Sequence, residues 1–220
     1  MNHHGSVDLV VLVADKDANF ALSEILANHQ RLAIRAIQAR VIPGEYHDSY
    51  VFRRCHDLLR SQLGLAGHAL VIFDREGCGS LHPRDVLEAD VEARLAQNGW
   101  VGCSAGVVID PELEAWVWGD SPHVHEALGW PCGGRSLRQW LEHEHYLIPG
   151  QRKPSRPKEA VQHAMRLARK KRSSALYGEL ARMVTFEHCS DPAFLKLKAT
   201  LRRWFPPQSG AGNNVGRGTT

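Results

Sequence analysis

A run of seven mostly apolar residues near the start of the chain, Val7 to Val13, most constrains its fold. Four of the seven are valine, and a short run of this kind is typical of a strand buried on both faces of a parallel sheet. Similar runs occur at His68 to Phe73 and Gly106 to Ile109, and Leu32 to Ala39 is also rich in β-forming residues. Segments with helical periodicity separate these runs. We therefore predict an α/β fold, with an open, mostly parallel sheet and flanking helices.

Helical patterns fill the intervals between the strands and most of the C-terminal half. In the first half we expect helices around Phe20 to Leu26, at Tyr50 to Leu63 and at Pro83 to Gln97. In the second half we expect helices at Ser136 to His143, Pro157 to Arg172 and Pro192 to Trp204. This pattern predicts an α/β core over residues 1–120 and a helical, basic part packed on it over 121–205. Residues 206–220, rich in Gly, Asn and Ser, have the composition of a disordered tail.

Charge is distributed unevenly along the chain, although the net formal charge is only +3. Residues 1–150 carry 12 Lys and Arg against 20 Asp and Glu, whereas residues 151–220 carry 15 against 4. The basic segment favours contact with a polyanion such as DNA or RNA. The alternative is that the basic helices simply dock on the acidic core. The residues expected to contact nucleic acid are Lys153, Arg169, Lys170, Lys171 and Arg172.

The sequence carries no feature typical of a secreted or membrane protein. Residues 1–6 lack the basic and apolar regions of a signal peptide, and no run reaches the roughly 20 apolar residues of a membrane-spanning helix. The five cysteines are scattered, form no Cys-x-x-Cys pair and are odd in number. Such usage is typical of free thiols in a reducing compartment, so we expect a cytoplasmic protein with no membrane partner.

Acidic side chains follow three of the predicted strands, at the point where each strand ends. The three clusters are Asp15 with Asp17, Asp74 with Glu76, and Asp110 with Glu112 and Glu114. Because the carboxyl ends of parallel strands meet at one edge of a sheet, we expect these clusters to converge. Carboxylates are the ligands that Mg²⁺ prefers, and one or two suffice because the ion keeps several waters. Like charges this close raise each other's pKa unless a cation neutralises them.

The same acidic residues have ordinary structural roles that stay open at this point. A single Asp after a strand commonly caps the next helix, and Asp110, which precedes a proline, has the sequence of such a cap. Asp15 or Asp17 could cap a helix in the same way. Glu112 and Glu114 could interact favourably with the positive, N-terminal end of a helix dipole. Three clusters with at least two carboxylates each are harder to assign to capping alone, and this coincidence favours a metal site.

Two other kinds of site are weighed and not expected. One is a zinc site made from a group of His and Cys residues, namely His123, His125, Cys132, His143 and His145. Their spacing matches no standard zinc site. The other is a nucleotide site, but the chain has neither a Walker A sequence nor a Rossmann glycine fingerprint.

The order of the three acidic motifs resembles that of TOPRIM-related proteins, such as those of OLD-type and RloB-type nucleases, and in particular a group of small TOPRIM-like proteins. In those families the first strand ends in Glu-Gly-x-x-acid, the second in Asp-x-acid and the third in a Pro-x-x-Glu-x-Trp-like motif. The most specific match here is the third, Asp110 to Trp116 (Asp-Pro-Glu-Leu-Glu-Ala-Trp). Asp74 and Glu76 match the second motif. The resemblance spans about residues 7 to 205, through short motifs only.

The resemblance implies a TOPRIM-like sheet and phosphodiester chemistry that depends on Mg²⁺ or Mn²⁺. The residues that it assigns to the metal ion are Asp74, Glu76, Glu112 and Glu114. The metal would stabilise negative charge on the phosphoryl oxygens. The chain departs from the family at the first motif, because either Asp15-Lys16 or Val13-Ala14, depending on the alignment, stands where the family has the Glu-Gly that supplies its general acid/base. The resemblance therefore leaves the catalytic proton transfer to Asp15 or Asp17.

These features predict a Mg²⁺-dependent nuclease or phosphodiester-processing component of a prokaryotic antiviral defence system, with nucleic acid as its partner. The missing Glu-Gly favours an alternative. In that alternative the chain is a catalytically weak partner or regulatory subunit, which keeps the fold in order to bind other subunits of such a system.

Overall fold

The computed structural model describes residues 7–44, 47–118, 123–131, 134–183 and 189–207. The strands are β1 (Val7–Val13), β2 (Ala39–Pro43), β3 (Ala66–Asp74) and β4 (Ser104–Ile109). The helices of the first half are α1 (Lys16–Ala27), α2 (His29–Leu32), α3 (His47–Leu58), the 3-10 turn η1 (Arg60–Gln62) and α4 (Arg84–Gln97). Those of the second half are α5 (Glu114–Val117), α6 (Val124–Leu128), α7 (Leu137–His143), α8 (Pro157–Leu167), α9 (Ser174–Met183) and α10 (Pro192–Trp204).

The four strands form one parallel sheet in the order β2-β1-β3-β4, which confirms the predicted α/β class. From β1 the chain crosses to β2 on one side and then returns to β3 on the other side. The strand order therefore reverses between β1 and β3, and in open sheets ligands bind at such a point, outside the carboxyl ends of the strands. Val13, the last residue of β1, pairs with Ile72, so β3 continues beyond the end of β1 to Asp74.

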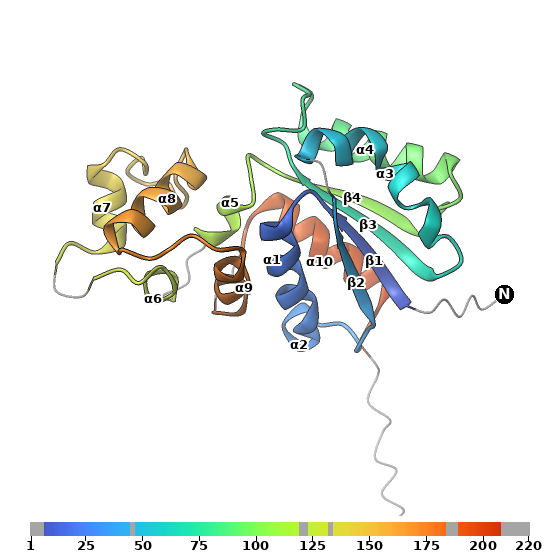
Figure 1. Cartoon of the computed structure of the whole chain (residues 1–220), viewed down its shortest axis with the longest axis horizontal. Coiled ribbons are helices and arrows are strands. Elements are labelled where there is room, and N and C mark those ends of the chain that lie inside the picture. The colour runs from blue at the N-terminus through green and yellow to red at the C-terminus, as the bar shows by residue number, and fades with distance from the viewer. Residues whose placement is uncertain (1–6, 45–46, 119–122, 132–133, 184–188, 208–220) are drawn as a thin grey trace, which may run out of the picture.

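Helices cover both faces of the sheet, as Figure 1 shows. Side chains alternate along β1, with Leu9 and Val11 on one face and Val10 and Leu12 on the other. The first face packs against α1 and α10, with α9 joining the same core through α1, and the second face packs against α3 and α4. All four of these side chains are fully buried, which explains why the run is apolar at every position rather than at alternate ones.

The edge strand β4 is covered by two glutamates of α4. The Glu88 side chain is 4% exposed, and its Oε1 accepts the backbone N–H of Val108 at 3.0 Å. Glu92 accepts the N–H of Gly106 at 3.1 Å. Lys196 of α10 bonds both carboxylates, at 3.1 Å and 2.7 Å, and so joins the helices of the two faces around the edge of the sheet. The backbone N–H groups of Gly106 and Val108 at this edge are thereby paired without a fifth strand.

The helices α6, α7 and α8 gather at one end of the molecule, away from the sheet (Figure 1). Trp118 joins them to the core, because its ring N–H donates to the backbone oxygen of Pro157 at 2.9 Å. In contrast, α9 packs along α1 and α10 packs beneath β4. Within the described residues, no helix is long and apolar enough to cross a membrane.

The structure corrects two of the predicted elements and adds a helix that was not predicted. The strand expected at Leu32 to Ala39 is wrong, because β2 lies later, at Ala39–Pro43, and residues 29–32 form α2. The helix expected to reach Arg172 ends at Leu167, and the sequence pattern did not reveal α9 at all. The predicted tail over 206–220 lies outside the described residues from position 208 onward.

Candidate functional site

A charged pocket lies at the carboxyl ends of β1, β3 and β4, where the strand order reverses. Its lining includes five carboxylates and two cationic side chains. The charged lining residues are Asp15, Asp17, Asp48, Asp74, Glu114, Lys158 and Arg172. The pocket therefore brings together four of the acids identified in the sequence, two from the first motif and one from each of the other two.

Asp15 and Asp17 enter the pocket at the start of α1. Asp15 is the N-cap of this helix, because its Oδ1 accepts the backbone N–H of Ala18 at 2.8 Å. Asp17 lies in the first turn and pairs with Arg172 at 2.9 Å. The capping alternative is therefore confirmed for Asp15, which nevertheless lines the pocket as well.

Asp74 is the last residue of β3 and faces another carboxylate, that of Asp48. The Oδ1 of Asp48 accepts the backbone N–H of Asp74 at 2.8 Å. Burial, followed by the negative charges of Asp48, Glu114 and Asp15, raises the pKa of the Asp74 carboxyl well above its ordinary value. Burial also raises the pKa of Asp48. Like charges in this pocket are therefore incompletely neutralised.

Glu114 is a buried acid at the first position of α5, with only 3% of its surface exposed. Its Oε1 accepts a hydrogen bond from the hydroxyl of Tyr177 at 2.6 Å. Burial and the negative charge of Glu114 raise the pKa of the Tyr177 phenol far above its ordinary value, so the hydroxyl stays protonated and donates. The carboxylate thus has a defined hydrogen-bond partner although it is buried.

Glu112 and Lys158 lie together at the border of the pocket. Glu112 Oε1 accepts the backbone N–H of Lys158 at 2.9 Å, and its Oε2 lies 3.6 Å from the Lys158 ammonium. Burial alone would lower the pKa of this ammonium. The nearby carboxylates, chiefly Glu114 and Glu112, outweigh burial and raise that pKa above its ordinary value. Glu112 therefore holds the start of α8 and is not among the residues that line the pocket.

The remaining acids of the sequence motifs lie outside the pocket. Glu76 is exposed, and its backbone N–H donates to Pro111 O at 2.9 Å. Asp110 is exposed and lies 3.5 Å from Arg75. It does not cap α5, whose N-cap is Leu113, so the predicted role of Asp110 as a helix cap is wrong.

The basic run of residues 169–172 forms a loop after α8 rather than a helical face. Arg169 has a positive φ of 53°, and its N–H donates to Arg166 O while that of Lys170 donates to Met165 O. This pattern of bonds ends a helix in a Schellman motif. Lys170 then bonds Ala127 O and Glu179, and Arg172 pairs with Asp17. Lys170 and Arg172 thus pair with groups of the protein itself. For these two cations, the alternative that the basic segment docks on the acidic core is confirmed.

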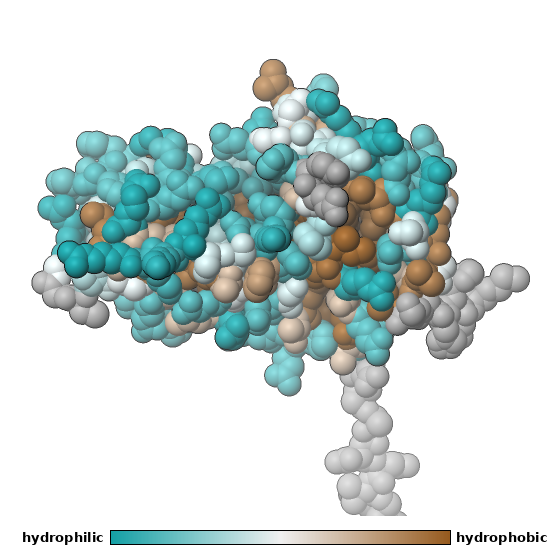
Figure 2. All heavy atoms as spheres, in the orientation of Figure 1, coloured by the Kyte–Doolittle hydropathy of each residue, from teal (hydrophilic) through white to brown (hydrophobic). Residues whose placement is uncertain are grey.

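Lys153, also expected at a nucleic-acid surface, pairs with Asp191 at 2.9 Å. Asp191 is buried and caps α10, and it also accepts the ring N–H of Trp116 at 3.0 Å. Figure 2 shows that hydrophilic residues cover the end of the molecule formed by α6, α7 and α8 on the face drawn. The exposed basic side chains at this end include those of Arg169 and Lys171.

The pocket fits a hard divalent cation by its donors. Carboxylate oxygens are the ligands of Mg²⁺, and the pKa of Asp74 is raised first by burial and then by neighbouring negative charges, which a cation would offset. In the part of the chain that the structure describes, no three His, Cys, Asp or Glu side chains are already arranged around one metal position. An ion that keeps several waters needs only one or two of them. The group of histidines weighed above includes Cys132, which lies outside the described residues.

Sequence reasoning missed three residues of this site, Asp48, Lys158 and Tyr177. Asp48 follows β2, so a correct position for that strand would have revealed a fourth acid at a strand end. Lys158 stands at the start of a predicted helix, but no pattern connects it to the acids. Tyr177 lies on α9, which was not predicted.

No family model matches this chain, and no match was found among curated proteins or solved structures.

Proposed function

We propose that this chain is a Mg²⁺-dependent, TOPRIM-like nuclease or phosphodiester-processing component of a prokaryotic antiviral defence system, acting in the cytoplasm. The observation that carries the proposal is the pocket at the strand-order reversal, in which carboxylates from three strand ends lie beside two cations. Acids that hold a metal and cations that attract a phosphate are both suited to metal-dependent phosphodiester cleavage. The sequence resemblance to TOPRIM-related proteins supports the same chemistry.

Each residue of the pocket has a role in this proposal. Asp74 and Glu114 would hold the ion, which when bound would stabilise charge on the phosphoryl oxygens. Lys158 and Arg172 would attract the phosphate, since their side chains remain 45% and 50% exposed while paired with acids. Asp15 would accept a proton, because Asp17 is occupied by Arg172.

The direct test is cleavage of plasmid DNA and of RNA with Mg²⁺ or Mn²⁺, comparing wild type with Asp74→Ala. We expect cleavage that requires the metal and falls by at least about 100-fold in the variant, because a charged ligand is removed. Asp85→Ala is the matched control, since Asp85 is an exposed acid in the first turn of α4. Equal cleavage by wild type and Asp74→Ala would exclude the proposed site.

A second function is favoured by a different observation, the replacement of the family's first Glu by an aspartate that caps α1. The chain would then be a catalytically weak partner subunit. If purified wild type cleaves neither DNA nor RNA with either metal, while Asp74→Ala still binds the same partner proteins, this second function is supported and the first is not.

The basic loop provides a separate prediction about nucleic-acid binding. Replacing Arg169 and Lys171 with serine should weaken binding and reduce the dependence of log K on log salt concentration by roughly one to two, about one for each phosphate that is no longer neutralised. Replacing Lys170, which bonds Ala127 and Glu179, should instead lower the melting temperature. Fluorescence anisotropy at several salt concentrations measures the first effect. An unchanged salt dependence in the double variant would rule out an interaction of this loop with phosphates.

A further inference from the structure

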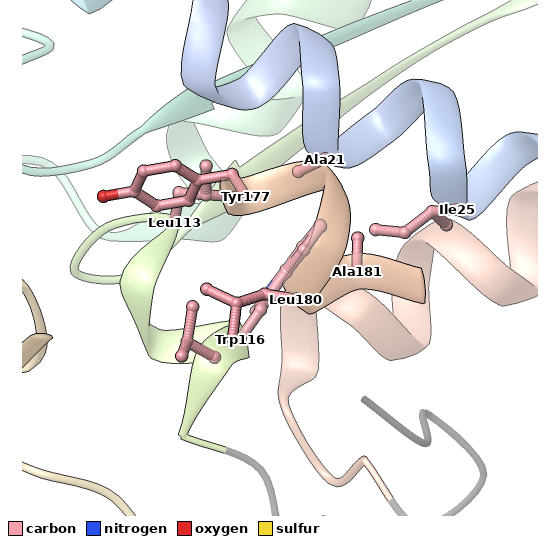
Figure 3. A pocket seen from close by; sticks show the side chains of 8 residues that line it. Ala21, Ile25, Leu113, Trp116, Tyr177, Leu180 and Ala181 are labelled. Atoms are coloured by element: carbon pink, nitrogen blue, oxygen red, sulfur yellow. The ribbon is translucent and has the colours of Figure 1, made fainter. Parts of the chain in front are cut away.

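The hydroxyl of Tyr177 reaches out of an apolar environment to the buried acid of the pocket. Its ring lines an apolar pocket between α1, α5 and α9, together with side chains such as Leu113, Trp116 and Leu180. Figure 3 shows its oxygen turned away from Trp116, Leu180 and Ala181. Tyr177 is 2% exposed, so its ring is held in place by the surrounding side chains.

The hydrogen bond from Tyr177 to Glu114 is short, at 2.6 Å, as expected when a hydroxyl donates to a charged carboxylate. Among the described residues, Tyr177 is the one hydrogen-bond donor to this carboxylate. Other charges also face Glu114, namely Lys158 from α8, Arg172 before α9, and the carboxylates Asp74 and Glu112. The Tyr177 hydroxyl therefore fixes the position of one oxygen of Glu114. The neighbouring charged groups attract or repel this carboxylate without a hydrogen bond that would orient it.

The position of Tyr177 is itself held by a close contact between two helices. Gly178, the next residue, lies against α1, where an added Cβ would come within 3.4 Å of the Glu24 side chain and 3.5 Å of Phe20 O. Arg182 of the same helix pairs with Glu24 at 3.0 Å, and Arg172 before it pairs with Asp17. Helix α9 is thus attached to α1 at both ends, which sets the depth at which Tyr177 enters the site.

We propose that Tyr177 is a positioning residue of this site, which orients the Glu114 carboxylate so that its other oxygen is available to a divalent cation. This proposal rests on the function proposed above and extends it, because it assigns part of the site to a helix outside the acidic motifs. Partners that orient a metal ligand in this way are often worth 10- to 100-fold in metal affinity.

The test is the affinity of the whole chain for Mn²⁺, measured by electron paramagnetic resonance for wild type, Tyr177→Phe and Tyr146→Phe. Tyr177→Phe keeps the buried ring and removes only the hydroxyl, so we expect its Mn²⁺ affinity to fall by roughly 10- to 100-fold. Cleavage by this variant should recover at high Mn²⁺ concentration, with the KM for nucleic acid unchanged. Tyr146→Phe is the matched control, because its hydroxyl contacts His163 at 3.2 Å, in the helical part.

The outcomes separate the two proposals. If wild type and Tyr177→Phe bind Mn²⁺ equally well, the positioning role is excluded while the metal site stands. A melting temperature lowered equally in both Phe variants, with unchanged Mn²⁺ affinity, would show that the hydroxyl is structural only. If wild type binds no Mn²⁺, the metal site and the positioning role are both overturned.

Discussion

Replacing Asp74 with asparagine is expected to raise the melting temperature of the metal-free protein and to remove its stabilisation by Mg²⁺. At neutral pH the ionised Asp74 is held among other carboxylates, and burial with these charges raises its pKa well above the ordinary value. Each tenfold change in its acid dissociation constant on folding corresponds to about 1.4 kcal/mol. For a chain of this size, that energy changes the melting temperature by roughly 3–6 °C. Asparagine has nearly the same shape and carries no charge.

The pH dependence of the same variant has a defined sign. A carboxyl whose pKa is raised by folding holds its proton in the folded state at pH values where the unfolded chain has released it. Its favourable contribution is therefore complete below its ordinary pKa of 3.8 and is lost as pH rises through the folded value. Wild-type stability should fall over that range more steeply than the stability of Asp74→Asn.

Scanning calorimetry with EDTA and with Mg²⁺ measures both effects, and a bound metal should stabilise only the wild type. Asp85→Asn, the same change at an exposed position, serves as the control. A lower melting temperature for metal-free Asp74→Asn would show that the charge of Asp74 stabilises the fold and that the pocket is already neutralised without a metal.

Replacing Glu88 with alanine should cause the largest loss of stability among the variants considered, about 3 kcal/mol or more. The change leaves the N–H of Val108 without its acceptor and removes a carboxylate that bonds Arg84 and Lys196. Breaking a buried ion pair at one side typically costs 3–5 kcal/mol. At this chain length, the melting temperature should fall by roughly 6–12 °C. Urea unfolding followed by tryptophan fluorescence measures the free energy of unfolding.

The control for this variant is Asp90→Ala, two residues along the same helix. Asp90 is exposed and pairs with Arg94 at 3.1 Å, and an exposed ion pair of this kind contributes less than about 1 kcal/mol. If Glu88→Ala proves as mild as Asp90→Ala, water replaces the glutamate at the edge of β4, and the glutamate does not hold the sheet edge.

The sequence was most informative where one local pattern decides the structure. The apolar runs of β1 and β3 have no helical alternative at their length, and Pro192–Trp204 begins with Asp191 and proline and ends as predicted. In contrast, β2 is a short, half-exposed edge strand ending in Pro43, so its signal is weak. The preceding segment, from Leu32 on, is richer in apolar residues, and for this reason the strand was predicted there rather than at Ala39–Pro43.

Helix α9 was missed because its stability comes from packing rather than from its own sequence. Gly178 in its middle costs roughly 1 kcal/mol of helix propensity, and its backbone lies directly against the Glu24 side chain and Phe20 of α1. The residues of the candidate site also divide into those that a local pattern reveals and those that only the complete fold brings together. The acids at strand ends were predictable from the topology, whereas Tyr177 and Lys158 come from distant segments whose position depends on the whole fold.

The acidic and the basic residues of the pocket lie far apart in the sequence, and this separation has a consequence for how the chain folds while it is synthesised on the ribosome. Arg172 pairs with Asp17 across 155 positions, and Tyr177 bonds Glu114 across 63. A nascent chain that ends before residue 158 would already contain the acids of all four strand ends without the cations and the hydroxyl that balance them. The acidic half of the pocket is thus translated well before its partners, and the sheet can reach its final stability only once α10, which packs on β4, has been made.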